Sequence, residues 1–275
     1  MWTKYQGALL WDANPNQKSP TRNDASSALR EMGGLFARWT SDFDCVASTP
    51  WWYCICDQFT SIEQLSAKQR YRVNKGLRSV RICRVEDTSI NIEDLYRLFI
   101  ESFEDYPKQY RPIIQENEFR NSTELQIQDP STDIWLAYDT NDTLVGYGRC
   151  IIRENVVWLN QVKVPTKYLS LEVNAALVYK ICEYYLSEKH CEYICDGERN
   201  IKHQTNYQEF LVRVLNFRYA YCKLNIVYKW WMQILVSILY PFKSMLKLAG
   251  KHSPFVYNVY CVLKQEQIRR SFNNM

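Results

Sequence analysis

The chain has 275 residues, of which 47% are hydrophobic and 23% are charged, and this composition excludes intrinsic disorder. The formal net charge of +4 is too small to indicate nucleic-acid binding by itself. None of the ten cysteines has a histidine at the spacing of a zinc site, so we expect reduced thiols, a cytoplasmic protein and no metal.

The first third of the chain predicts a loop, two helices and three strands. A polar, proline-containing stretch at 14–27 indicates a loop, and residues 28–32 close a short helix. Ser61 is followed three residues later by Gln64, which predicts the start of a helix that runs toward Leu77. Strands are expected at residues 35–40, 51–57 and 80–85.

The middle of the chain has the clearest periodicity. Apolar residues at helical spacing predict helices at 92–103, 172–186 and 206–215. Alternating apolar residues between turn signals predict strands at 134–138, 144–152, 156–164, 193–195 and 219–228. From residue 80 the order is therefore strand, one or two helices, three antiparallel strands, and then helix, strand, helix, strand.

Five consecutive residues with ionisable or flexible character follow the strand at 193–195. They are Asp196-Gly197-Glu198-Arg199-Asn200, and the next helix begins shortly after them. In α/β folds chemistry usually gathers where strands end, because the loops there converge on a crevice. We interpret this stretch as a candidate site; the alternative is a charged turn with a glycine for the bend.

The order and spacing of these elements resemble the GCN5-related N-acetyltransferase (GNAT) fold. Residues 196–200 and 217–221 (FRYAY) resemble the second lobe of FemAB-like acyltransferases, and residues 51–53, 66–72 and 75–77 resemble the crossover that feeds this lobe. The resemblance covers roughly residues 38–229. It implies an α/β fold of layered α+β type with a mixed, mostly antiparallel central sheet. The implied parts are a truncated first lobe at 1–78, an acyltransferase domain at 79–229 and a helical tail at 230–275.

Such proteins transfer an acyl or aminoacyl group from a thioester or ester to a primary amine. GNAT enzymes use acyl-coenzyme A, such as acetyl-coenzyme A, whereas Fem-type ligases use aminoacyl-tRNA. The resemblance therefore implies an N-acyltransferase that acts on a small amine, an amino sugar or amino acid destined for a surface polysaccharide. Two alternatives stay open: an aminoacyl-tRNA-dependent Fem-type ligase, and a non-catalytic GNAT-like binding protein.

The sequence departs from the GNAT pattern in two places. The GNAT pyrophosphate loop has glycines that let backbone N–H groups approach phosphates at a helix start. Residues 167–176 contain no glycine, and Glu172 would repel a pyrophosphate there. Val212 stands near the aligned place of the tyrosine that protonates the leaving thiolate in many GNAT enzymes, and Tyr207, one turn earlier, is the possible substitute. The missing glycines favour the ligase, and the truncated first lobe disfavours it.

The catalytic candidates follow from the chemistry of aminolysis. The attacking amine must lose a proton, and the tetrahedral oxyanion must be stabilised. Glu198 and Asp196 are the candidate bases, followed by His203, for which a surface histidine is the alternative, and the GNAT resemblance makes Tyr207 the candidate acid. The alternative for each carboxylate is a role in the turn or an ion pair with Arg199.

The donor-binding candidates come from the resemblance. The fourth and fifth GNAT strands splay apart and expose a backbone N–H to the donor carbonyl, which places this contact at Val162, Lys163 and Val164. Asn174 and Ala175 stand where the donor's phosphates would meet the helix start. We expect the two strands to part near residues 161–164 and 193–196.

The substrate-binding candidates are polar or aromatic residues in two stretches. Arg199 could clamp a carboxylate or phosphate of the substrate, and Asn200 lies beside it. Arg38 and Trp39, in a strand that ends near Asp42, suit the wall of a sugar or amino-acid pocket. The alternatives are a cap on the following helix for Asn200, and a core tryptophan beside a turn for Trp39.

The tail from residue 229 differs in kind from the rest. Its tryptophans and lysines suit a helix that lies in a membrane interface, and Pro241 should break that helix. A helix packed on the domain and a dimer contact are the alternatives. The apolar run at 230–242 is shorter than the roughly 20 residues of a membrane span, and Lys4, Gln6 and Asp12 interrupt any signal peptide. We therefore expect a cytoplasmic protein with peripheral contact at the inner face of the membrane through residues 230–251.

Overall fold

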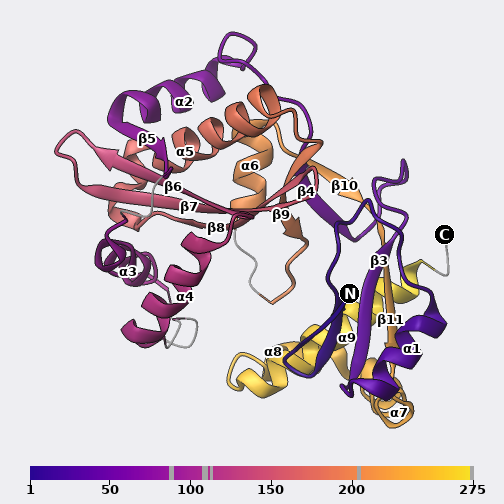
Figure 1. Cartoon of the computed structure of the whole chain (residues 1–275). Helices are drawn as coiled ribbons and strands as arrows, with labels where there is room; N and C mark the ends of the chain where they lie inside the picture. Colours follow the sequence, from indigo (N-terminus) through magenta and orange to yellow (C-terminus); the bar gives the residue numbers. More distant parts are fainter. Residues whose placement is uncertain (87–89, 107–110, 112–113, 203–205, 273–275) are drawn as a thin grey trace. The chain divides into compact units, whose positions relative to one another are not determined.

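The computed structural model describes residues 1–86, 90–106, 111, 114–202 and 206–272 (Figure 1). The chain gathers into two compact units. Unit 1 comprises residues 1–53, 198–205 and 219–275, and unit 2 comprises residues 54–197 and 206–218. The domain boundaries expected from the sequence, at 1–78, 79–229 and 230–275, stay a prediction.

Unit 1 contains a four-stranded sheet, counted over the described residues, in the order β1-β2-β3-β11. Strands β1 and β2 form an antiparallel hairpin, and β3 runs parallel to β2 and antiparallel to β11. Leu9, Leu29 and Trp39 belong to the core between this sheet and helix α1 (Arg22–Glu31). The strands span Trp2–Tyr5, Ala8–Trp11, Phe36–Ser41 and Lys223–Tyr228.

The tail of unit 1 consists of helices. They are α7 (Trp230–Leu239), a 3₁₀ turn (Tyr240–Phe242), α8 (Lys243–Ala249) and α9 (Pro254–Ser271). Pro241 lies in the 3₁₀ turn, so the predicted break is observed. Helix α9 is fixed to β11 by a buried carboxylate, because the Tyr228 hydroxyl donates to Glu266 at 3.1 Å. Arg269 and Arg270 pair with the same carboxylate at 2.8 and 2.7 Å.

Unit 2 is built on a seven-stranded sheet, again counted over the described residues, in the order β10-β4-β9-β8-β7-β6-β5. Strands β5 to β8 are antiparallel neighbours, whereas β8 and β9 are parallel. In β4, β9 and β10 the chain passes from one unit to the other. The strands span Trp52–Cys56, Val80–Arg84, Thr132–Asp139, Leu144–Arg153, Val156–Lys163, Tyr193–Glu198 and Arg218–Tyr221 for β4 to β10.

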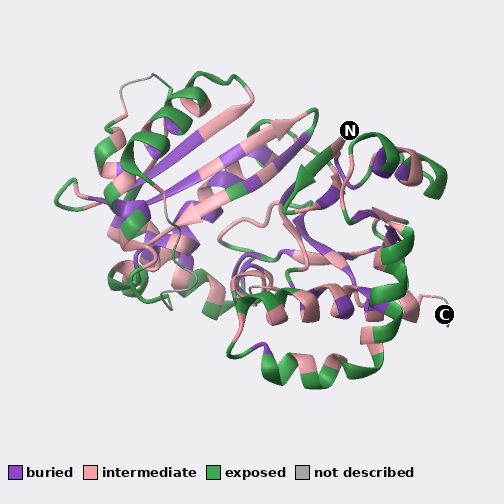
Figure 2. Ribbon diagram, turned by 90° about the horizontal axis from the view of Figure 1, so that it is seen from below, coloured by how far each residue is buried: buried purple, intermediate pink, exposed green. Residues whose placement is uncertain are grey.

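Helices cover both faces of this sheet (Figure 1). Helices α2 (Ala67–Ser79), α5 (Val173–Cys182) and α6 (Tyr207–Leu215) lie on one face, and α3 (Ile92–Glu101) and α4 (Glu116–Gln128) on the other. A 3₁₀ turn (Thr166–Leu171) precedes α5, and a π-helical turn (Glu183–Glu188) follows it. Figure 2 shows buried residues along the strands and exposed residues on the outer sides of the helices. The mixed, layered architecture is the predicted fold class.

Two predicted helix starts were wrong. Helix α1 begins at Arg22, where the sequence suggested a loop, because Thr21 forms a capping box with Asp24. Helix α2 begins at Ala67 rather than after Ser61, because a second Ser-x-x-Gln pair, Ser66 with Gln69, makes the capping box. The backbone N–H of Ser61 does donate to the Gln64 side chain at 3.2 Å, but that pair only closes a turn.

The single strand predicted at 219–228 was also wrong, because β10 and β11 belong to different sheets. Cys222 lies between them. Its N–H donates to the Trp51 carbonyl at 3.0 Å, and its carbonyl accepts from the Thr49 hydroxyl at 2.8 Å. The apolar pattern continues through this change of sheet, which is why periodicity alone did not reveal it.

None of the helices in the described ranges is both long enough and apolar enough to cross a bilayer.

Candidate active site

Strands β8 and β9 of unit 2 pair over only part of their length. Val156, Val157 and Trp158 lie opposite Tyr193, Ile194 and Cys195, and the described residues of the two strands pair no further. Strand β8 continues to Lys163 and β9 to Glu198. The strands therefore part after Trp158, two or three residues earlier on β8 than the sequence analysis placed the split.

A β-bulge in β8 lies where the split begins. In the register of β7 with β8, Arg149 faces Gln161 and Cys150 faces Leu159, so Asn160 is the extra residue. A bulge bends its strand and increases the local twist. The bulge at Asn160 thus gives a physical reason for β8 to leave β9.

Asp196 is the first residue of β9 beyond the paired segment. Burial raises the pKa of its carboxyl to about 7, and a weak hydrogen bond from Gln208 Nε2 at 3.3 Å to Oδ2 opposes this rise only in part. The next residue, Gly197, has φ +108, and a Cβ added there would meet no heavy atom within 4 Å. Open space thus adjoins Gly197, and the preceding residue, Asp196, has a buried carboxyl with a pKa of about 7.

Tyr207, the first residue of α6, has a buried hydroxyl. No described residue forms a hydrogen bond with this oxygen. Burial raises the pKa of the phenol well above its ordinary value, and the nearby Asp196 carboxylate raises it further. A neutral phenol without a partner among the described residues is available to donate a proton or a hydrogen bond to a bound molecule. The sequence predicted both Asp196 and Tyr207, and their catalytic roles stay a prediction.

The start of α5, expected to bind the phosphates of coenzyme A, is packed against α2. Glu172 precedes the helix with φ +59, and its carboxylate accepts from Arg72 Nε at 2.9 Å and pairs with Nη2 at 2.7 Å. A Cβ on Gly76 of α2 would lie 2.6 Å from the Glu172 carbonyl oxygen, and Ala175 is fully buried. The carboxylate and the packed surface do not fit a pyrophosphate at Asn174 and Ala175.

The other predicted donor residues lie on β8 beyond the bulge. Val162 pairs with Gly148 and Lys163 with Tyr147, so their backbones belong to the β7–β8 ladder. Val164 follows the strand and packs over Gly146. The Lys163 ammonium lies 3.9 Å from the centroid of the Phe103 ring and 5.7 Å from that of Phe99, and burial lowers the pKa of Lys163 to about 8.

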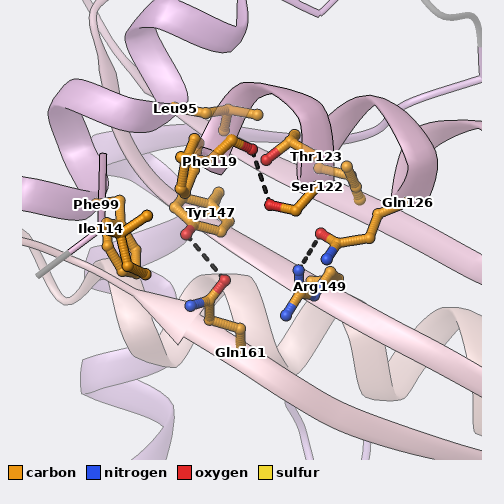
Figure 3. A pocket seen from close by; sticks show the side chains of 11 residues that line it. Leu95, Phe99, Ile114, Phe119, Ser122, Thr123, Gln126, Tyr147, Arg149 and Gln161 are labelled. Carbon is orange, nitrogen blue, oxygen red and sulfur yellow. Dashed lines mark hydrogen bonds between the residues drawn. The ribbon is translucent and has the colours of Figure 1, made fainter. Parts of the chain in front are cut away.

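A cavity of about 240 Å³ lies on the face of the sheet that α3 and α4 cover (Figure 3). The exposed side chain of Ser122 lies among its lining residues, so the cavity reaches the surface. Sequence reasoning missed this cavity, because its polar groups come from three separate elements. The described lining residues are Leu95, Phe99, Ile114, Phe119, Ser122, Thr123, Gln126, Ile134, Tyr147, Arg149 and Gln161.

In unit 1, Glu198 forms an ion pair with Arg38. Arg38 also donates to Gln265 Oε1 at 3.0 Å, so β3 and α9 both contribute to this cluster. Trp39, on the same strand, is buried and lies edge-on to Trp2 at 6.1 Å, which is the core-tryptophan alternative.

The remaining predicted residues of unit 1 lie outside the helices and strands. Asp42 is exposed with φ +55, and Asn200 is exposed. Arg199 stacks 4.5 Å from the centroid of a Trp52 ring and donates to the Pro50 carbonyl at 2.6 Å. Its guanidinium is thus turned to the backbone and a ring. His203 lies outside the described residues.

The described residues contain no group of three or more His, Cys, Asp or Glu that could hold a metal ion.

Comparison with known proteins shows the fold. No protein-family model matches the chain, and no curated protein sequence matches it. The structure of L-PGS from Bacillus licheniformis matches with 12% identity and a TM-score of 0.53, covering 86% of this chain and 83% of that chain. FemX matches with 8% identity and a TM-score of 0.53, covering 79% and 77%.

An aminoglycoside acetyltransferase from an uncultured soil metagenomic sample, solved with sisomicin, matches with 16% identity and a TM-score of 0.38. It covers 49% of this chain, and the match covers 86% of that chain. The likeness to L-PGS and FemX confirms the predicted resemblance at the level of the fold: the chain has a GNAT-type, FemAB-like fold.

Proposed function

We propose that the chain is an acyltransferase that moves an acyl group from an activated ester or thioester to a primary amine. The observation that carries this proposal is the split between β8 and β9, with the Asp196 carboxyl directly beyond the paired segment and the buried Tyr207 hydroxyl near that carboxyl. The split offers a slot in which an amine nitrogen and an activated carbonyl meet. The fold shared with FemX and L-PGS supports the same reaction class.

The proposed step uses the two side chains as base and acid. The amine nitrogen attacks the carbonyl carbon, and its proton passes to the Asp196 carboxylate. Backbone N–H groups of β8 beyond Trp158 stabilise the oxyanion. The bond from the carbonyl carbon to sulfur or oxygen then breaks, and the leaving group takes the proton of the Tyr207 hydroxyl. Solvent returns the proton from Asp196 to Tyr207, so the protein is unchanged after one turnover.

The donor is proposed as an acyl thioester such as acyl-coenzyme A, with aminoacyl-tRNA as the second candidate. The start of α5 favours the second, because Glu172 and the packing of α2 oppose a pyrophosphate at that helix. A thioester donor therefore has to place its phosphates away from Asn174 and Ala175. An aminoacyl ester needs no pyrophosphate site at all.

The helical tail is proposed as a peripheral membrane contact. Trp230, Ile238 and Leu248 expose 76%, 60% and 63% of their surface, so α7 and α8 present apolar side chains to solvent. Lys243, Lys247 and Lys251 lie on or just after α8. Apolar side chains beside lysines suit the interface of an anionic bilayer.

The test is product formation. The full chain is incubated with acetyl-coenzyme A, longer acyl-coenzyme A thioesters or aminoacyl-tRNA, each with a set of primary amines, and amide products are detected by mass spectrometry. We expect Asp196→Asn to slow amide formation by about 10²–10⁴-fold. Glu209→Gln, at an exposed carboxylate of the same helix as Tyr207, is the matched control and should keep the full rate. Equal rates for Asp196→Asn and the unmodified protein would refute the assignment of the base.

A further inference from the structure

The cavity under α3 and α4 has an apolar side and a polar side. Figure 3 shows Phe99 and Ile114 at one side and Gln126 and Arg149 at the other, with the hydrogen bond from Tyr147 to Gln161 between them. Tyr147 donates to Gln161 Oε1 at 2.9 Å, which leaves the Gln161 amide N–H groups as donors.

Arg149 has only neutral partners in the described part of the chain. Its Nε and Nη2 donate to Asn160 Oδ1, at 3.0 and 2.5 Å, and its Nη1 donates to Gln126 Oε1. A guanidinium has five N–H donors, so two of them remain for a ligand. Burial lowers the pKa of Arg149, which agrees with a cation that no carboxylate stabilises.

A second arginine of unit 2 shows the contrast. The side chain of Arg72 is half-buried, with 31% of its surface exposed, and its guanidinium pairs with the Glu172 carboxylate at 2.7 Å. A half-buried cation normally acquires such a partner, because an unpaired charge out of water is costly. The Arg149 guanidinium therefore suits an ion pair in which a bound ligand supplies the anion.

The ligand's size and charge follow from the cavity. Arg149 is the one charged side chain among the described lining residues, so a monoanion balances it better than a phosphate dianion. A planar carboxylate also matches the fork of a guanidinium. A volume of about 240 Å³ equals that of about eight liquid water molecules at roughly 30 Å³ each, which suits a small molecule. Because the rings of Phe99 and Phe119 line the cavity, we expect the ligand to carry an apolar group.

Strand β8 takes part both in the cavity and in the split from β9. Gln161 lines the cavity and comes directly after the bulge residue, Asn160, which itself holds the Arg149 guanidinium. A ligand held by Arg149 and Gln161 thus lies against the strand at which the split begins.

We propose that this cavity binds a small carboxylate with an apolar side chain, its carboxylate on Arg149 and its apolar part against Phe99 and Phe119. Resting on the proposed function, this ligand is the acceptor, an α-amino acid with an apolar side chain such as leucine. The α-amino group is the nitrogen that is acylated.

The test compares L-leucine with L-leucinamide, which lacks the carboxylate, by isothermal titration calorimetry on the full chain. We expect the unmodified protein to bind the acid at least about tenfold more tightly than the amide. Arg149→Gln should weaken binding of the acid by about tenfold to a hundredfold and leave the amide unchanged. Gln126→Glu, nearly isosteric, places a carboxylate on Arg149 and should have the same effect without removing the arginine. Arg149→Lys keeps the charge and should retain part of the preference.

The outcomes separate this inference from the proposed function. Equal binding of acid and amide, no binding of either, or an acid affinity that ignores both substitutions overturns the site. Glu209→Gln should keep the affinity for L-leucine, since Glu209 is exposed on α6 and does not line the cavity. Arg149-dependent binding without transfer from any donor would reject the proposed function and keep the site. Transfer that is equally fast to amines without a carboxylate would keep the proposed function and reject the site.

Discussion

The carboxyl of Asp196 makes stability depend on pH in a direction opposite to that of an ordinary surface aspartate. Its pKa is about 7 in the folded chain against 3.8 for a free aspartate side chain. Between about pH 4 and pH 7 the folded state therefore holds a proton that the unfolded state has lost, so this group's contribution to stability declines as pH rises.

Asp196→Asn should remove that dependence. Urea denaturation at pH 5 and pH 8 measures it, and the unmodified protein should lose more stability between these values than the variant. Glu209→Gln serves as the control at an exposed carboxylate. If the unmodified protein and Asp196→Asn lose the same stability between pH 5 and pH 8, the pKa of Asp196 is not raised in the folded state.

The hydroxyl of Tyr207 should matter for the rate of transfer but not for the stability of the fold. Because the oxygen is buried and has no partner among the described residues, Tyr207→Phe should leave the free energy of unfolding unchanged or raise it by about 1 kcal/mol. The same variant should slow transfer by about 10–100-fold, since the leaving group loses its proton donor. Denaturation and rate measurements on one preparation check both. A loss of more than about 1 kcal/mol would show that the hydroxyl has a structural partner.

At this scale the sequence identified the residues at the end of β9, because a strand followed by ionisable side chains is a local signal. It did not identify Arg149, because its partners Gln126 and Asn160 come from α4 and β8. It offered an ion pair with Arg199 only as an alternative for Glu198 and did not point to Arg38. The true partner, Arg38, is 160 positions away in the sequence, and no local pattern encodes that contact.

At the scale of elements, the close contact of α2 with α5 sets the environment of Glu172. A Cβ on Gly76 would lie 2.6 Å from the Glu172 carbonyl oxygen and 2.8 Å from Ala176 Cβ. Gly76→Ala should therefore destabilise the chain by about 1–3 kcal/mol, although alanine favours helices elsewhere.

Arg78→Ala, at an exposed position of the same helix, is the matched control and should cost about 0.5 kcal/mol or less. Chemical denaturation measures both variants. A Gly76→Ala protein as stable as the control would mean that α2 and α5 are further apart than the structure shows.

Helices α7 and α8 carry the second prediction at this scale. Ile234 and Ile238 expose 53% and 60% of their surface, and burying them in a bilayer interface would contribute free energy through removed apolar area. Changing both to serine should lower partition onto vesicles with anionic lipids at least about tenfold. Leu125→Ser, at a residue of α4 that is 70% exposed, is the control for a loss of surface apolarity. Sedimentation with vesicles measures the partition, and an unchanged value for the double variant would end the membrane proposal.

The order of elements was largely predictable, because strands β5 to β8 and helices α3 and α6 carry strong periodicity, and α5 is apolar on nearly all sides. The helix starts were less predictable. Two Ser-x-x-Gln pairs, at Ser61 and Ser66, offer the same capping signal, and only packing selects one of them. The π-helical turn after α5 was not predictable, since its apolar spacing differs little from that of an α-helix.

At the scale of the whole molecule, sequence order does not follow the compact units. Strand β3 pairs with β11 over Phe36–Ser41, so the first residues and the last third of the chain share one sheet. Pairings of this kind depend on long-range topology and leave no mark in a local pattern. The same holds for the split, because periodicity predicts that β8 and β9 exist but not how far they pair.

Amide hydrogen exchange in β8, read residue by residue by NMR, tests the split most directly. Among β8 amides that do not donate to β7, we expect those at 159–163 to exchange at least about tenfold faster than those at 156–158, and to slow when a non-hydrolysable acyl donor is added. Uniform protection from 156 to 163 in the free protein, with no change on adding any donor, would show two strands joined along their whole length and would contradict the account.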